Sequence, residues 1–193
     1  LRLVLRRDGY SKLPKDNRWG TFPGISAGWV LSRENFMESC SNVLSYAKIR
    51  ASYGANGNVS GVLDANGNVV TGLDYYTVQG SYGIMKDKDG KIVPNYNGKV
   101  PLMINDLPNP TMRWEKSYTF ETGFDIGFLN NKYILNFTYY NRRTQDKFAE
   151  ITLPSHSGVS SFLSNNGEVQ NQGMELELTA NVLRTKDWKF TVS

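Results

Sequence analysis

The chain has 193 residues, of which 39% are hydrophobic, 12% aromatic and 21% charged, and its formal net charge is +4. The basic residues are scattered among carboxylates and form no stripe, which argues against nucleic-acid binding. No run approaches ~18 consecutive apolar residues, so no transmembrane helix is expected. The single cysteine, Cys40, excludes an internal disulfide framework and is expected to be a small buried or interfacial residue.

Three strands are predicted in the first part of the chain, over residues 1–8, 18–31 and 47–54. Their alternation is less regular than in the later part of the chain. In the second of them, Ile25, Ala27 and Trp29 fall on one face, as period-two alternation requires of a strand with two different faces.

Four further strands are predicted over residues 114–128, 133–148 and 168–182 and from residue 188 onward. The first is the clearest, because Phe120, Phe124 and Ile126 alternate with Glu121 and Asp125. At ~3.3 Å per residue, its fifteen residues would extend about 50 Å. Strands of ordinary globular proteins have only ~3–10 residues.

The connections between these strands alternate in length along the chain. Residues 32–46, 129–132 and 183–187 form shorter connections, whereas residues 9–17, 55–113 and 149–167 form longer or Gly- and Asn-rich ones. Outer-membrane barrels sort their connections in this way, with short periplasmic turns and long extracellular loops. Residues 55–113 are therefore expected to be a large extracellular loop that contains small hairpins.

The register of the strands follows from the cost of charge in lipid. If Phe120, Phe124 and Ile126 contact lipid, then Glu121 and Asp125 point into a wet lumen. The opposite register would place both carboxylates in lipid, where a charge costs up to ~2–4 kcal/mol near the midplane and a carboxylate somewhat less. Seven strands cannot close such a barrel, and both termini read as mid-strand sequence. The prediction is an all-β, antiparallel segment of a larger transmembrane β-barrel.

Eight phrases of the sequence, in order and spacing across nearly the whole chain, resemble the SusC/RagA family of TonB-dependent outer-membrane transporters. They are residues 5–9 (LRRDG), 17–23 (NRWGTFP), 26–29 (SAGW), 48–58 (KIRASYGANGN), 109–116 (NPTMRWEK), 125–131 (DIGFLNN), 139–144 (YYNRRT) and 165–175 (NNGEVQNQGME).

The resemblance implies a 22-stranded barrel with a plug in its lumen, located in the outer membrane of a Gram-negative bacterium. Residues 1–193 would be part of that single barrel domain, without the plug, the TonB-contacting segment or the terminal strand. The family imports oligosaccharides, or in some members peptides, together with a SusD-like surface lipoprotein and driven by TonB. Neither a cofactor nor an enzymatic activity is implied. The alternative is a secreted, soluble β-sandwich that binds carbohydrate, which leaves the strand lengths and the sorted connections unexplained.

The expected site residues are the tyrosines of the large loop, Tyr75, Tyr76, Tyr82 and Tyr96. An aromatic face in a polar loop can stack on a sugar ring, contact a capping partner or pack the loop itself, and all three readings remain open. The carboxylates Glu115, Glu121, Asp125, Glu175 and Glu177 are expected to be solvated lumen wall rather than acid–base pairs.

Catalytic and metal sites are not predicted. His156 is the only histidine, lies in a loop and lacks a recognisable nucleophile elbow nearby. Residues 64–67 (DANG) and 87–90 (DKDG) do not continue as calcium-binding loops. Their Asn-Gly and Asp-Gly steps between apolar residues favour hairpin turns instead.

Overall fold

The computed structural model describes residues 1–40, 42–63, 69–73, 75–93, 97, 99–184 and 189–192. In that part of the chain, none of the helices is both long and apolar enough to cross a membrane.

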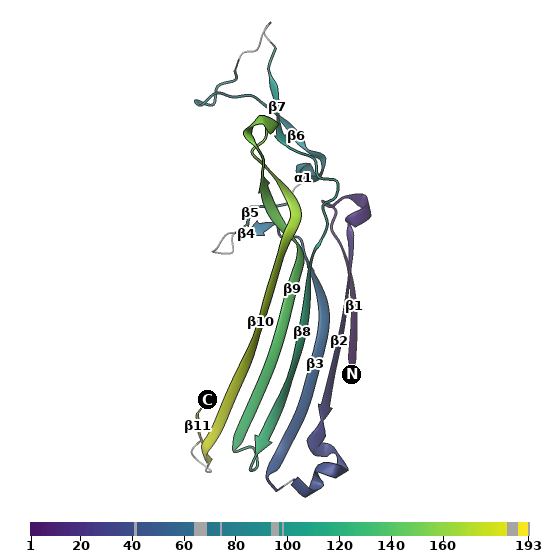
Figure 1. The fold of residues 1–193 in the computed structure, drawn as a ribbon, viewed down its shortest axis with the longest axis vertical. Helices are drawn as coiled ribbons and strands as arrows, with labels where there is room; N and C mark the ends of the chain where they lie inside the picture. The colour runs from purple at the N-terminus through teal and green to yellow at the C-terminus, as the bar shows by residue number, and fades with distance from the viewer. Residues whose placement is uncertain are drawn as a thin grey trace.

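The main body is one antiparallel sheet of seven strands in the order β1-β2-β3-β8-β9-β10-β11 (Figure 1). This confirms the predicted number of strands and the all-β class. The strands are β1 (Arg2–Gly9), β2 (Trp19–Val30), β3 (Leu44–Asn58), β8 (Glu115–Phe128), β9 (Tyr133–Thr152), β10 (Ser161–Arg184) and β11 (Lys189–Val192).

The remaining elements lie in the connections. Residues between β3 and β8 form β4 (Val62–Leu63), β5 (Val69–Thr71), α1 (Tyr75–Gln79), β6 (Ser81–Ile84) and β7 (Leu102–Asp106). β4 pairs with β5, and β6 pairs with β7, as two small separate sheets. Between β2 and β3 the chain forms two 3₁₀ segments, Leu31–Arg33 and Asn35–Cys40. We call the end of the sheet that carries β4–β7 the collar end, which is uppermost in Figure 1, and the opposite end the turn end.

The structure corrects the predicted connection over residues 149–167. β9 and β10 continue to pair as far as Thr152 and Ser161, so only residues 153–160 connect them. The ladder passes two register shifts, at Asn165/Gly167 and Gly167/Val169, and on β9 Asp146 has a φ of 56°. Such bulges allow a pair of strands to bend and twist without separating. The two strands therefore leave the main sheet as a hairpin at the collar end.

The strand registers divide the sheet into two chemically different faces. One row of paired residues runs Trp29, Ile49, Phe124, Phe137 and Leu176 across five strands. Phe124 and Phe137 stack with ring centroids 5.1 Å apart. The neighbouring row on the other face runs Val30, Lys48, Asp125, Asn136 and Glu177. Pairing along the strands thus keeps the mainly apolar row and the mainly polar row on opposite faces of the sheet.

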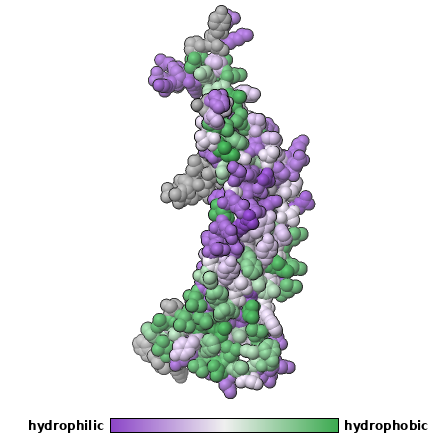
Figure 2. Space-filling model, viewed as in Figure 1, coloured by the Kyte–Doolittle hydropathy of each residue, from purple (hydrophilic) through white to green (hydrophobic). Residues whose placement is uncertain are grey.

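The apolar face is exposed. Leu176 is 69% exposed, Leu178 58% and Trp29 53%. In Figure 2, hydrophobic side chains gather over the part of the sheet toward the turn end, and hydrophilic side chains cover the part above it. From Met174 to Val182 the apolar stretch extends about 26 Å along β10, which at the ~40° strand tilt of outer-membrane barrels is about 20 Å of height, comparable to their ~25 Å apolar band.

The buried side chains lie elsewhere, at the collar end. Seven of the nine buried hydrophobic residues in the described part of the chain form one cluster: Leu13, Phe22, Leu73, Met112, Trp114, Phe148 and Leu163. They come from the segment after β1, from β2, from the β3–β8 connection and from the β9–β10 hairpin. The cluster therefore joins connections that are distant in sequence.

A charge on the apolar face should destabilise the protein far more than the same charge on the polar face. Leu176→Arg places a cation at the centre of the apolar band and is expected to cost ~2–4 kcal/mol if lipid covers that face. The free energy of unfolding of the full-length protein in lipid vesicles would be measured by urea titration. Glu175→Arg, one residue away on the polar face, is the matched control and should change it by less than ~1 kcal/mol. Equal effects of the two variants would contradict the assignment of the faces.

Candidate functional site: the polar wall and the collar

The polar face of the sheet carries charged and hydroxyl side chains at closely spaced positions. Glu121, Asp125, Glu175 and Glu177 lie on this face, as predicted. Three cations share this face. Arg2 pairs with Ser26, which lies in the same row as Ser52 and Glu121. Arg50 and Lys48 lie in the rows that follow toward the turn end. The face therefore offers both signs of charge to a polar solute, whereas the sequence pattern predicts only the carboxylates there.

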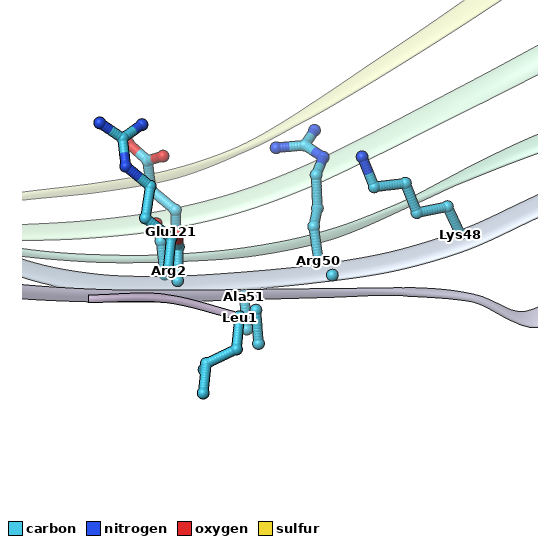
Figure 3. A pocket seen from close by; sticks show the side chains of 10 residues that line it. Leu1, Arg2, Lys48, Arg50, Ala51 and Glu121 are labelled. Carbon is cyan, nitrogen blue, oxygen red and sulfur yellow. The ribbon is translucent and has the colours of Figure 1, made fainter.

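A shallow hollow in this wall is lined by Arg2, Ser26, Lys48, Arg50, Ser52 and Glu121. Figure 3 shows Arg2, Glu121, Arg50 and Lys48 on one side of the strands, with Leu1 and Ala51 directed to the other side. The hollow is open, and its lining has guanidinium, ammonium, hydroxyl and carboxylate groups. Such a surface can donate and accept hydrogen bonds, and it has no nucleophile positioned by a base.

Arg50 does not project into the hollow freely, because it lies across the neighbouring strand. Its Nη2 donates to Thr138 Oγ1 on β9 at 2.6 Å, and its Nε is 3.5 Å from Asp125 Oδ1 on β8. To reach β9 it crosses β8 above Gly123, where an added Cβ would lie 3.3 Å from Arg50 Nη2 and 2.3 Å from the carbonyl oxygen of Phe137. Because Gly123 has no side chain, Arg50 of β3 can pass over β8 and bond to β9.

At the collar end, Asn109 connects two distant segments. It is 7% exposed, its Nδ2 donates to the carbonyl oxygen of Leu163 at 2.9 Å, and its Oδ1 accepts from the backbone N–H and the hydroxyl of Thr111. Met112, three residues on, is fully buried. A buried amide with its donors and acceptors satisfied fixes its surroundings, since breaking any of these bonds leaves a buried polar group unpaired.

Trp114 brings in a third segment. Its ring makes edge contacts with Phe22 and Tyr10, at centroid distances of 5.4 and 6.4 Å, and its Nε1 donates to the carbonyl oxygen of Arg18. Asn17 Nδ2 also donates to the carbonyl oxygen of Met112 at 3.0 Å. The segment between β1 and β2 is therefore held against the segment that precedes β8. We use the name collar for residues 10–18, 109–115, 146–148 and 163–165.

The prediction that Glu115 belongs to a solvated lumen wall is wrong. Glu115 is 4% exposed, and its carboxylate accepts from Asn58 Nδ2 at 2.7 Å and from the backbone N–H of Phe148 at 2.6 Å. It has the strand parity of Glu121, but it lies where the collar covers the polar face. Two charge-assisted hydrogen bonds offset the cost of its burial.

An ion pair and a side-chain amide complete the collar. Arg113 Nη2 is 2.6 Å from Asp146 Oδ1, and this hydrogen bond raises the pKa of the Arg113 guanidinium. Asn165 Nδ2 donates to the carbonyl oxygens of both residues, at 2.9 and 2.6 Å, and its Oδ1 accepts from the Arg113 N–H. Sequence reasoning identified the phrases that contain these residues but not their roles. The signal available in the sequence was an amide residue, Asn165, close to the glycine at which the strand register shifts.

The four predicted tyrosines are only partly placed. Tyr82 lies on β6 and is 75% exposed, so it does not pack the loop. Tyr75 and Tyr76 belong to α1, with side chains outside the described part, and Tyr96 lies outside the described residues altogether. A common site of the four therefore stays a prediction.

His156 is exposed in the 3₁₀ turn Ser155–Ser157, as expected of a solvated loop histidine. Cys40 is exposed rather than buried, because the 3₁₀ segment that it ends lies outside the sheet. Among the described residues, no three His, Cys, Asp or Glu side chains gather in a way that could hold a metal ion.

A twisted antiparallel sheet with an exposed apolar band, a polar wall and extended connections at one end is the architecture of an outer-membrane β-barrel wall. The family described as TonB dependent receptor-like, beta-barrel, matches residues 2–193. The chain belongs to this family, and it is homologous to the SusC/RagA transporters.

Similar curated proteins include TonB-dependent receptor SusC of Bacteroides thetaiotaomicron, 32% identical over 98% of this chain, and TonB-dependent receptor P3 of Formosa agariphila, 31% identical over 97%. The chain spans 18% and 17% of the lengths of these two relatives. Among solved structures, the RagAB peptide importer in its open-open state has a TM-score of 0.75 and 25% identity, covering 98% of this chain and 18% of that one.

The family lies in the outer membrane of Gram-negative bacteria, and its members are transporters rather than enzymes. The apolar face of the sheet is therefore the lipid-facing side, and the polar wall faces the lumen. A secreted β-sandwich, the alternative from the sequence, is incompatible with the family match over nearly the whole chain.

Asn109→Ala should loosen the collar without unfolding the barrel wall. It removes the donor to Leu163 and the acceptor for Thr111, and the loss of these buried hydrogen bonds is expected to cost ~1–3 kcal/mol locally. Limited proteolysis of intact cells that produce the full-length protein should show faster cleavage within residues 59–113. Asn105→Ala, on exposed β7, should leave the cleavage rate unchanged. Protection equal to that of the wild type would contradict the role of Asn109.

Gly123→Ala should weaken the junction of β3, β8 and β9. The added methyl group would meet the carbonyl oxygen of Phe137 at 2.3 Å and displace Arg50 from Thr138, and overpacking of this kind typically costs ~1–3 kcal/mol. Urea unfolding of the full-length protein, followed by tryptophan fluorescence, would measure the loss. Gly54→Ala is the control, because its nearest neighbour would be 3.7 Å from the new Cβ. A smaller loss for Gly123→Ala than for Gly54→Ala would refute this account.

Proposed function

We propose that the chain forms part of an outer-membrane nutrient importer for oligosaccharides, working with a SusD-like surface lipoprotein. TonB would act through a segment outside residues 1–193. The observation that carries the proposal is the combination of a wall rich in hydrogen-bonding groups with a packed collar at the end that carries the long connections. Transport requires such a wall to bind a polar solute weakly at many points rather than tightly at one.

The composition of the wall supports an oligosaccharide as the solute. Hydroxyl, amide and carboxylate groups from Ser26, Ser52, Asn136, Thr138 and Glu121 lie along one face, and sugar hydroxyls both donate and accept hydrogen bonds. A peptide is the second candidate. The structural similarity to the RagAB peptide importer and the presence of both charge signs on the wall favour it, because a peptide carries both an ammonium and a carboxylate group.

Growth of the source bacterium would separate these two solutes. A strain that lacks the full-length gene should lose growth on one class of neutral oligosaccharide and regain it when the gene is restored, while growth on free monosaccharide is unchanged. Loss of growth on peptides alone would show that the transported solute is a peptide and not an oligosaccharide. Unchanged growth on both classes would refute nutrient import by this protein.

The lipoprotein partner would contact the exposed extracellular side chains, of which Tyr82 is a suitable example. Tyr82→Ala should weaken co-purification of the lipoprotein with the full-length transporter, with a loss of about 5- to 30-fold in affinity for an interface tyrosine. Tyr133→Ala is the control, because this residue is also exposed but lies on the lipid face at the turn end. Equal losses in both variants would contradict a contact by Tyr82.

A further inference from the structure

The outward face of the barrel wall changes character abruptly at the top of the apolar band. Going toward the collar, the band of apolar and aromatic outward residues ends with Leu5 on β1, Tyr118 on β8 and Tyr139 on β9. A cation follows on each of these strands: Arg7 and Lys116 are the next outward residues of β1 and β8, and Arg143 comes two outward positions further on β9, after Asn141. We call these three residues the basic girdle.

The strand registers fix the direction of these three side chains. Arg7 lies two residues from Leu5 and stacks over the ring of Trp19, with its Cζ 5.2 Å from the ring centroid. Lys116 lies two residues from Tyr118, and Tyr118 pairs directly with Arg143. Because side chains alternate along a strand, all three share the face of the lipid-contacting residues.

The girdle lies at the membrane boundary on the extracellular side. Tyr118 lies in the row of Arg143 and Tyr53 in the next row, and Tyr133 marks the opposite edge of the band. Aromatic residues concentrate at both interfaces of outer-membrane barrels, and their long connections are extracellular. The girdle is therefore at the level of the headgroups of the outer leaflet.

The charge of the girdle is only partly balanced by carboxylates. On the outward face of the described sheet between the band and the bulge at Gly167, Glu168 is the only carboxylate, and it pairs with Arg143. Gln170 and Gln172 occupy the corresponding outward positions of β10. The carboxylates Glu121, Asp125, Glu175 and Glu177 are all on the lumen side. The lipid-facing surface at this level thus carries a net positive charge.

The spacing of the cations divides them into two positions. Lys116 and Arg143 are diagonal neighbours on adjacent strands, a relation that separates side chains by roughly 7–8 Å. Arg7 lies three strands from Lys116, a distance of at least about 14 Å. One extended headgroup with two separated anionic groups would reach both positions.

We propose that the basic girdle binds the phosphate groups of a phosphorylated glycolipid in the outer leaflet. An outward-facing strand residue at this height meets the headgroups of the outer leaflet, and the cations are complementary to anionic phosphate groups rather than to a headgroup without net charge. Guanidinium groups pair with phosphate through two parallel hydrogen bonds. The acyl chains of the same lipid would lie against the apolar band directly below.

The test uses the full-length transporter in detergent micelles, titrated with diphosphoryl lipid A and with its dephosphorylated form. Bound lipid would be counted by native mass spectrometry. The variant is Arg7→Gln, Lys116→Gln and Arg143→Gln combined. The matched control removes three cations from the extracellular connection instead, as Lys86→Gln, Lys88→Gln and Lys91→Gln. A heat-dependent shift in gel mobility confirms that each protein is a folded barrel.

The wild type and the control should retain at least ~10-fold more diphosphoryl than dephosphorylated lipid, and the girdle variant should lose this preference. Unchanged preference in the girdle variant, or no preference in the wild type, would overturn the proposal. Complete competition by inorganic phosphate would also overturn it, since that result indicates a site for a soluble anion. If the triple variant does not fold, Lys116→Gln and Arg7→Gln are compared singly, and each should reduce the preference severalfold.

Discussion

The hydrogen-bond ladder that joins β3, β8, β9 and β10 is the constraint on which the rest of the structure depends. In a barrel wall, the backbone groups have no water to bind in the hydrocarbon region, so each must pair with a neighbouring strand. Pairing then fixes the register, and the register assigns every residue to lipid or to lumen. The row from Trp29 to Leu176 and the row from Val30 to Glu177 are two results of the same ladder.

The collar solves a different physical problem with different chemistry. Above the membrane the connections are in water, where a strand pair alone is marginally stable. Here a small apolar cluster around Met112 and Trp114 supplies burial, while Asn109 and Asn165 satisfy backbone groups that have left the ladder. In the collar, burial of apolar side chains therefore supplies the stability, and the polar side chains connect segments that are far apart in sequence.

Alternation in the sequence was sufficient to predict the strands, their faces and the membrane-exposed band, because these depend on period-two patterning alone. The same pattern misassigned Glu115, since parity gives a side but not the tertiary segment that covers it. The β9–β10 connection was predicted too long, because Gly and Asn near residues 165–167 mark bulges as readily as loops.

The side-chain network of the wall and the collar was beyond prediction. That Arg50 crosses β8 to reach Thr138 depends on the spacing of three strands, of which β3 and β8 are separated by a long connection. Likewise, the role of Asn109 depends on the position of Leu163, 54 residues later. Such contacts follow from the three-dimensional register, and a one-dimensional pattern carries no information about them.

The continuation of β9 and β10 above the membrane has a mechanical consequence. Both strands run without a break from the turn end to residues 152 and 161, so the extracellular hairpin and the membrane wall form one continuous ribbon. A pull on the hairpin along the strand direction loads the many hydrogen bonds of this ladder together, in shear, instead of opening them one after another. The hairpin can therefore transmit force directly to the wall. The pair β6 and β7, whose strands bond only to each other, would separate under a smaller force.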